Sequence, residues 1–235
     1  MEFGGFSAGT LDFLFENRMH DSRAWFEEHK EQYVTLVQTP LRALVAELEP
    51  AVRKLDPLIE AGPSGRKAIS RIYRDTRFSR DKTLFRDFMW VSFLRDKKLE
   101  YELPSYYFEI SQSGYAYGCG YYMPAPALME TIRGLILGGD RLFCAALETL
   151  ERQDLFELCG ERYKRPRYPD QPERLRSWLE MRTIWFERRS NDFKTLFSPD
   201  LTGQLISGYE LLKPVYDFMC HADETRIRKE EIGNH

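Results

Sequence analysis

Cationic side chains are concentrated in one short segment of the chain, residues 66–82, which reads RKAISRIYRDTRFSRDK. Seven of its residues are Arg or Lys, and only Asp75 and Asp81 are acidic. The whole chain has a formal net charge of -3, so this positive charge is local. Because a guanidinium keeps its charge, arginines that lie close together need an anion or a carboxylate partner. The segment therefore predicts either an anion-binding site or a group of internal ion pairs.

In an extended strand, alternate side chains lie on the same face. Arg71, Tyr73, Asp75 and Arg77 would then share one face, with Arg74 on the other. Asp75 could orient the two flanking guanidinium groups and leave their outward donors for phosphate or carboxylate. The residues that we expect to bind such a ligand are Arg71, Arg74, Asp75, Arg77, Ser79, Asp81 and Lys82.

Two other interpretations of these residues stay open. In one, the arginines and aspartates form an internal ion-pair lattice, and the protein acts through association with other proteins. In the other, the cations contact the backbone of a single-stranded nucleic acid and Tyr115, Tyr117 or Tyr121 stack on its bases. An aromatic stripe in a strand is more often part of the core, and we favour that interpretation for these tyrosines. The pI of about 5.9 also argues against non-specific coating of nucleic acid.

No motif of an established catalytic class is present. The chain lacks G-x-S-x-G, G-x-x-x-x-G-K-[S/T] and a G-x-G-x-x-G that opens a helix. Its four cysteines are widely spaced, and its histidines form no H-x-x-x-H pair, so the spacing proposes neither a disulfide framework nor a metal site. Asp75 and Asp81 lie among cations, which should lower their pKa values and suits an anchor better than a general acid. We therefore assign no catalytic residue, metal or cofactor, and the sequence leaves open whether the protein is an enzyme.

The composition is that of a soluble globular protein. The chain has 235 residues, of which 43% are hydrophobic and 30% charged. No apolar run approaches the roughly 20 residues of a membrane span, and no secretory signal is visible. We expect a cytoplasmic protein without a membrane partner. The sequence does not predict an oligomeric state.

Periodicity predicts helices, then strands, then helices, which is typical of an α+β fold. We expect an antiparallel sheet in the middle of the chain, packed against N-terminal and C-terminal helices. Ser113-Gly114 predicts a hairpin, Asp140 a helix N-cap, and Pro214 a helix break. We expect one domain over residues 1–235, with frayed ends at about 1–9 and 223–235. The expected strands are 68–78, 90–94, 106–111, 115–123 and 183–187.

Several of these motifs resemble one known family. They are N-x-x-x-x-x-R-x-W-F at 17–26, R-I-Y-R-D-T-R-F-S-R-D-K-T at 71–83, Y-Y-F-E-I-S followed by G-x-G-Y-Y-M-P within 106–124, K-R-P at 164–166 and S-P-D at 198–200. The chain resembles domain of unknown function 2461, a family of uncharacterised, mainly bacterial proteins. The resemblance implies a single α+β domain and marks the Arg-rich segment as the family signature. One departure is visible: the family pattern continues K-T-P-Y-K, where this chain has Leu84, Phe85 and Arg86 in the last three places.

Overall fold

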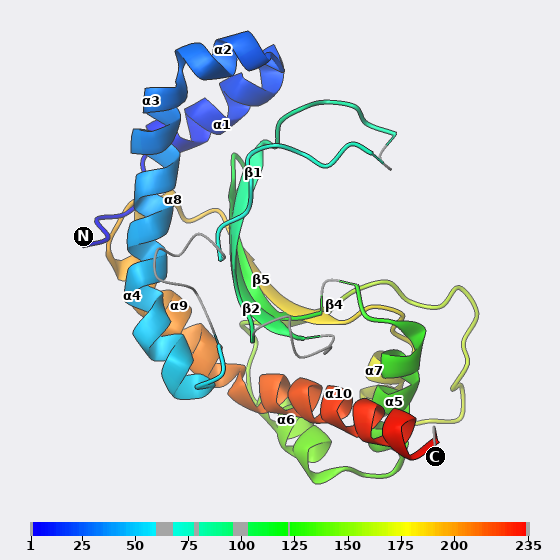
Figure 1. The fold of residues 1–235 in the computed structure, drawn as a ribbon. Coiled ribbons are helices and arrows are strands. Elements are labelled where there is room, and N and C mark those ends of the chain that lie inside the picture. The colour runs from blue at the N-terminus through cyan, green and yellow to red at the C-terminus, as the bar shows by residue number, and fades with distance from the viewer. Residues whose placement is uncertain (1, 60–67, 78–79, 96–102, 122, 234–235) are drawn as a thin grey trace. The chain divides into compact units, whose positions relative to one another are not determined.

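The computed structural model describes residues 2–59, 68–77, 80–95, 103–121 and 123–233 (Figure 1). The N-terminal part is helical, the middle holds most of the strands, and helices return toward the C-terminus. The elements, in chain order, are α1 (Ala8–His20), α2 (Arg23–Glu28), α3 (Lys30–Gln32), the π-helical segment η1 (Tyr33–Gln38), α4 (Thr39–Leu55), β1 (Phe88–Phe93), β2 (Ser105–Ser111), β3 (Gly114–Gly120), α5 (Pro126–Leu137), α6 (Arg141–Glu151), β4 (Glu157–Cys159), α7 (Glu173–Leu179), β5 (Trp185–Ser190), α8 (Phe193–Leu196), α9 (Asp200–Leu211) and α10 (Lys213–Gly233).

The strands form one five-stranded antiparallel sheet in the order β1-β2-β3-β5-β4. The predicted α+β fold, with a mid-chain antiparallel sheet and helices at both ends, is confirmed. The hairpin at Ser113-Gly114 is also present, because β2 and β3 are joined by a two-residue turn and Gly114 has a φ of 121°. Such a left-handed φ favours glycine. Within the described ranges, no helix is both long and apolar enough to cross a bilayer.

By its internal packing the chain divides into two compact units. The first comprises residues 1–93, 107–117 and 189–207, and the second comprises residues 94–106, 118–188 and 208–235. The single domain expected over residues 1–235 stays a prediction.

In the first unit, β2 has one apolar face and one polar face. Phe108 and Ile110 are fully buried, whereas Glu109 and Ser111 between them are partly exposed. The ring of Phe6 stacks on Phe108 at 5.7 Å. Phe3 is also buried, so the described N-terminal residues pack into the core instead of fraying as expected. A second apolar stripe comes from α4, whose fully buried residues follow the helical period: Leu41, Leu44, Leu48 and Val52.

In the second unit, α10 packs against α5 and α6. Asp140 caps α6, accepting the backbone N–H groups of Leu142 and Phe143, as its sequence position predicts. The expected break at Pro214 is seen as the end of α9 at Leu211 and the start of α10 at Lys213.

The C-terminal helix continues well beyond the point where a frayed tail was expected. It runs to Gly233, and Arg226 forms ion pairs with Asp223 at 2.9 Å and with Glu230 at 3.0 Å. These pairs, at i,i+3 and i,i+4 spacing, favour helix over a disordered end.

Candidate anion-binding loop

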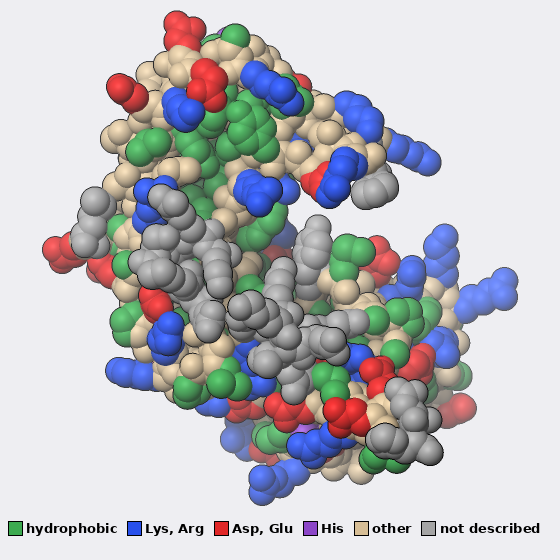
Figure 2. Space-filling view, in the orientation of Figure 1, with side chains coloured by type: hydrophobic (Ala, Val, Ile, Leu, Met, Phe, Trp, Pro, Cys, Tyr) green, Lys and Arg blue, Asp and Glu red, His purple; other side chains and the backbone are tan. Residues whose placement is uncertain are grey.

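The Arg-rich segment forms one arm of an irregular hairpin in the first unit. Isolated bridges pair Ile69 with Val91 and Tyr73 with Phe85, so the segment lies antiparallel to the stretch that leads into β1. The expected continuous strand over 68–78 is therefore reduced to single bridges, and residues 78 and 79 lie outside the described ranges. We call residues 71–86 the Arg loop. In Figure 2, Lys and Arg side chains gather over this segment.

Over residues 71–77, side chains of the Arg loop alternate in exposure, as expected for an extended chain. Arg71, Asp75 and Arg77 are exposed, whereas Ile72 is buried and Arg74 is partly covered. The alternation does not continue in the second arm of the loop, where Lys82 is exposed and Phe85 is buried.

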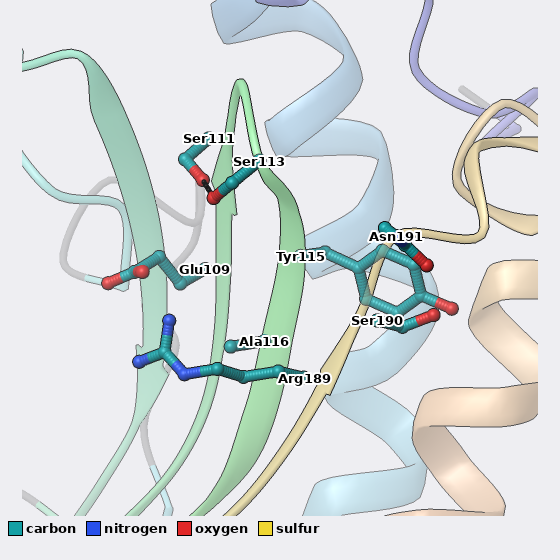
Figure 3. A pocket seen from close by; sticks show the side chains of 8 residues that line it. All are labelled: Glu109, Ser111, Ser113, Tyr115, Ala116, Arg189, Ser190 and Asn191. Atoms are coloured by element: carbon teal, nitrogen blue, oxygen red, sulfur yellow. Dashed lines mark hydrogen bonds between the residues drawn. The ribbon is translucent and has the colours of Figure 1, made fainter.

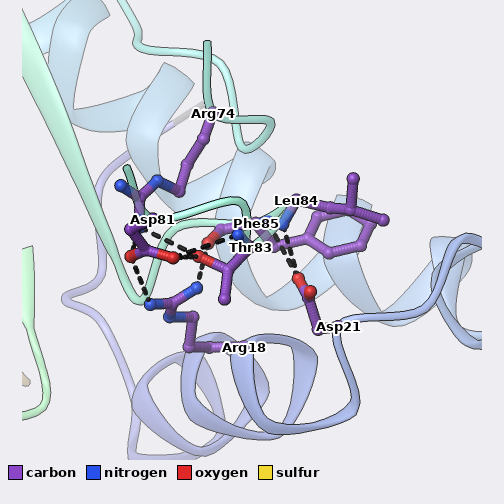
Figure 4. A network of polar contacts seen from close by, with 7 residues as sticks. All are labelled: Arg18, Asp21, Arg74, Asp81, Thr83, Leu84 and Phe85. Carbon is purple, nitrogen blue, oxygen red and sulfur yellow. Dashed lines mark hydrogen bonds and ion pairs between the residues drawn. The ribbon is translucent and has the colours of Figure 1, made fainter. Parts of the chain in front are cut away.

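On the inner face, the Asp81 carboxylate is the centre of a polar network (Figure 4). Arg18 of α1 donates to Asp81 Oδ2 at 3.1 Å, and Arg74 donates to the same oxygen. Thr83 donates to Oδ1 through its backbone N–H at 3.0 Å and through its hydroxyl at 2.7 Å. Arg74 also donates to the Thr83 hydroxyl at 2.9 Å. The network closes the loop on itself and joins it to α1.

These contacts set the protonation of Asp81. The Thr83 N–H and hydroxyl, followed by the Arg74 and Arg18 guanidinium groups, hold the pKa of the Asp81 carboxyl well below its usual value of 3.8. The carboxyl is therefore ionised at physiological pH. This state suits the role of anchor expected from the sequence.

Asp21 provides a second attachment. It ends α1 with a φ of 45°, and its Oδ1 accepts the backbone N–H of Leu84 at 2.6 Å and of Phe85 at 3.3 Å (Figure 4). Arg18 and Asp21 were not predicted as site residues. Both lie inside the 17–26 motif, but no spacing rule connects that motif to a loop more than 60 positions away.

On the outer face, Asp75 and Arg77 form a close ion pair. The distance from Arg77 Nη2 to Asp75 Oδ2 is 2.7 Å, and Nε donates to Oδ1 at 3.0 Å. This hydrogen bond from Arg77 is the main cause that lowers the pKa of Asp75 from 3.8 to about 2. Asp75 thus orients Arg77, but the described contacts show no matching bond from Asp75 to Arg71.

The remaining expected residues have different positions. Lys82 donates from Nζ to the carbonyl of Thr76 at 2.8 Å, which closes the tip of the loop. Arg71 is exposed, and Ser79 lies outside the described residues. The structure thus brings Arg74 together with Asp81, and Asp75 together with Arg77, as two separate pairs.

Arg86 has a structural position. Its Nη1 donates to the carbonyls of Arg71 and Tyr73, the latter at 3.0 Å, and its guanidinium lies 4.4 Å from the centre of the Trp90 ring. These contacts fix the two arms of the hairpin to each other.

The tyrosines considered for base stacking are part of the core. Tyr115, Tyr117 and Tyr121 are 4%, 1% and 3% exposed, which confirms the core interpretation. A nucleic acid has no access to these rings.

The loop at residues 163–168 belongs to the second unit, and hydrogen bonds to an acidic side chain hold its backbone in place. The Glu180 carboxylate accepts the backbone N–H groups of Arg167 at 2.8 Å and Tyr168 at 2.7 Å. Beside it, Arg133 is only 2% exposed and donates to the carbonyls of Leu179 and Met181. This buried arginine was not predicted as a functional or structural residue, because it lies in an apolar helical stretch.

Among the described residues, no group of three or more His, Cys, Asp or Glu side chains could hold a metal ion.

Comparison with known proteins agrees with the resemblance noted in the sequence. No curated protein and no solved structure matches the chain. The model of one family, described as "Conserved hypothetical protein (DUF2461)", matches residues 9–218. This range contains both anchors of the Arg loop and nearly the whole fold, so the chain belongs to the DUF2461 family of conserved hypothetical proteins.

Proposed function

We propose that the Arg loop binds a phosphorylated or carboxylated small molecule. The observation that carries the proposal is the division of its charges between two faces. On the inner face, Arg74 and Arg18 share the Asp81 carboxylate, whereas on the outer face Arg71, Arg77 and Lys82 are exposed and Asp75 is the acid beside them.

The inner network supports this division because it positions the loop without using the outer cations. A loop whose backbone is already fixed loses less conformational entropy when it binds. The network and the Asp21 contacts together hold both sides of the loop tip, so its ligand contacts are partly pre-organised. Arg74 and Asp81, expected to bind the ligand, are then positioning residues.

The outer face has the chemistry for anion binding. The Arg77 side chain is 77% exposed, and its pairing with Asp75 orients a planar group that can give two parallel hydrogen bonds to phosphate or carboxylate. Lys82 adds a compact charge. An intracellular metabolite with such a group would fit the cytoplasmic setting expected from the sequence.

Nucleic acid is the weaker alternative. Sequence-tolerant binding of a single strand requires exposed aromatic rings as well as cations. The tyrosines considered for this role are buried, which leaves only the charges.

The test is a thermal-shift and calorimetric titration with phosphate, sulfate, nucleotides, sugar phosphates and small dicarboxylates. Arg77→Gln and Lys82→Gln are compared with Arg152→Gln. Arg152 is a matched control because it is an exposed arginine, 79% accessible, with its own acidic partner, Glu148, at 3.6 Å. We expect a selective shift in the wild type that both loop variants reduce and the control retains. Equal shifts in all four proteins, or none with any ligand, would refute the proposal.

A further inference from the structure

A second polar site lies on the first unit, on the face of the sheet opposite Phe108. It is a pocket of about 310 Å³ whose polar lining comes from β2, β5 and the adjoining turns. The lining residues used below are Glu109, Ser111, Ser113, Ala116 and Arg189.

Strand alternation explains why these groups share one face. Phe108 and Ile110 point into the core, so Glu109 and Ser111 point the other way. Figure 3 shows the side chains of Glu109 and Arg189 on the same side of the sheet, with only the small Ala116 beneath them. The fold thus brings a carboxylate of β2 and a guanidinium of β5 to one pocket.

The walls of the pocket are fixed by their neighbours. Ser111 Oγ and Ser113 Oγ lie 2.9 Å apart, which orients both hydroxyls at one end. On the opposite side of the sheet, the Tyr115 hydroxyl accepts a hydrogen bond from Gln204 at 2.9 Å. At Gly114 a Cβ would lie 2.2 Å from the carbonyl oxygen of Ser190, so only glycine allows β3 to approach the strand that carries Arg189.

We propose that this pocket binds a small zwitterion with the ammonium and carboxylate groups of an amino acid. The Arg189 guanidinium donates two parallel hydrogen bonds to the ligand carboxylate, and the Glu109 carboxylate accepts hydrogen bonds from the ligand ammonium. The Ser111–Ser113 pair adds neutral donors and acceptors on the same side of the sheet (Figure 3). A ligand with a single charge would complement one of these groups only, whereas a zwitterion complements both.

The size of the pocket limits the ligand. Its volume is at the lower end of the range of about 300–1,000 Å³ typical of ligand sites, which suits a molecule of few heavy atoms. Glu109 and Arg189 also take part in other interactions of the protein. The ligand therefore shares these charges, and we expect millimolar rather than nanomolar affinity.

The test uses three probes of similar size: glycine, acetate and methylamine. Amide chemical shifts are recorded by NMR in the wild type, Glu109→Gln, Arg189→Gln and the control Lys194→Gln. Lys194 is an exposed cation of α8 that does not line the pocket. We expect glycine to shift the amides of Ser111 and Ala116 at concentrations at which acetate and methylamine do not. Each pocket variant should weaken glycine binding about tenfold or more, and the control should not.

The other outcomes reject the proposal. If acetate acts like glycine and Glu109→Gln has no effect, the pocket is a plain anion site. If no probe shifts the pocket amides, Glu109 and Arg189 serve only the sheet. Because none of these variants changes a residue of the Arg loop, either result leaves the function proposed for that loop untouched.

Discussion

Replacement of Asp21 by alanine tests how the Arg loop is attached to the helices. The Asp21 carboxylate accepts two backbone N–H groups, from Leu84 and Phe85, and the residue has a left-handed backbone conformation. Asp21→Ala removes the acceptor and places a side chain with no local hydrogen bond at a φ of 45°. The loop then loses its hydrogen bonds to the end of α1, whereas the contacts of Arg18 and of the Phe26 ring remain.

The expected effect follows from these two contributions. A hydrogen-bonding interaction with a charged group contributes about 1.5–3 kcal/mol, and a left-handed conformation without a compensating hydrogen bond costs about 1–2 kcal/mol. The sum is a loss of about 2.5–5 kcal/mol in the free energy of unfolding. At about 2–4 °C per kcal/mol for a protein of this length, the melting temperature should fall by about 5–20 °C.

The assay compares thermal unfolding with hydrogen exchange at the amides of Leu84 and Phe85. Asp21→Asn is the matched control, because asparagine tolerates the same φ and keeps an oxygen acceptor. It should lose only the charge-assisted part, about 1–1.5 kcal/mol. Wild-type stability and unchanged amide protection in Asp21→Ala would refute the anchoring role. An equal loss in both variants would show that charge, not hydrogen-bond geometry, is what matters.

Three further predictions concern other parts of the molecule. Since the pKa of Asp75 is lowered to about 2 from 3.8, its stabilising contribution should be fully present above about pH 4 and lost as the pH falls through about 2, as carboxyl NMR titration would show. Arg133→Met should leave two buried carbonyls unpaired and cost about 1–3 kcal/mol for each, measured by urea unfolding. Gly118→Ala would place a Cβ 1.8 Å from the Phe186 oxygen and should abolish soluble folded protein, whereas Gly134→Ala, with open space around its Cβ, should stabilise its helix by about 0.5–1 kcal/mol.

Each of these has a distinct contradicting result. An Asp75 titration midpoint near 3.8 in the wild type would mean that Arg77 does not hold its carboxylate in solution. Wild-type unfolding of Arg133→Met would show that water replaces the guanidinium. Normal folding of Gly118→Ala would show that β3 and β5 can separate without loss of the sheet.

The parts of the fold that the sequence predicted depend on local signals. A hairpin turn, an Asp N-cap and a helix break before Pro214 each involve only a few neighbouring residues. Thr10 shows the limit of such signals: a threonine just before an apolar helical run is a favoured N-cap, but Ser7 is the N-cap of α1 and the Thr10 hydroxyl donates to the carbonyl of Leu36 at 2.7 Å. Thr10 therefore makes a long-range hydrogen bond to Leu36, and a residue three positions earlier caps the helix.

The parts that were not predicted depend on long-range contacts. β4 has only three residues, Glu157–Cys159, and its pairing partners in β5 are 26 or more positions along the chain. In the same way, Asp81 could be recognised as an anchor among cations, but its partner Arg18 is 63 positions away. Periodicity and spacing describe the faces of single elements. They therefore identified the concentration of cations in the Arg loop, but they could not show that the loop packs against α1.

Leu84 and Arg86 attach the hairpin without adding to the charge of its outer face. A proline at position 84 would have no N–H, so the 2.6 Å hydrogen bond to Asp21 requires a residue other than proline there. Arg86 has a planar group that binds two carbonyls and lies over the Trp90 ring, which a lysine could not do in the same way. Residues 84–86 therefore set how firmly the loop is held, and the ligand contacts are to be sought among residues 71–82.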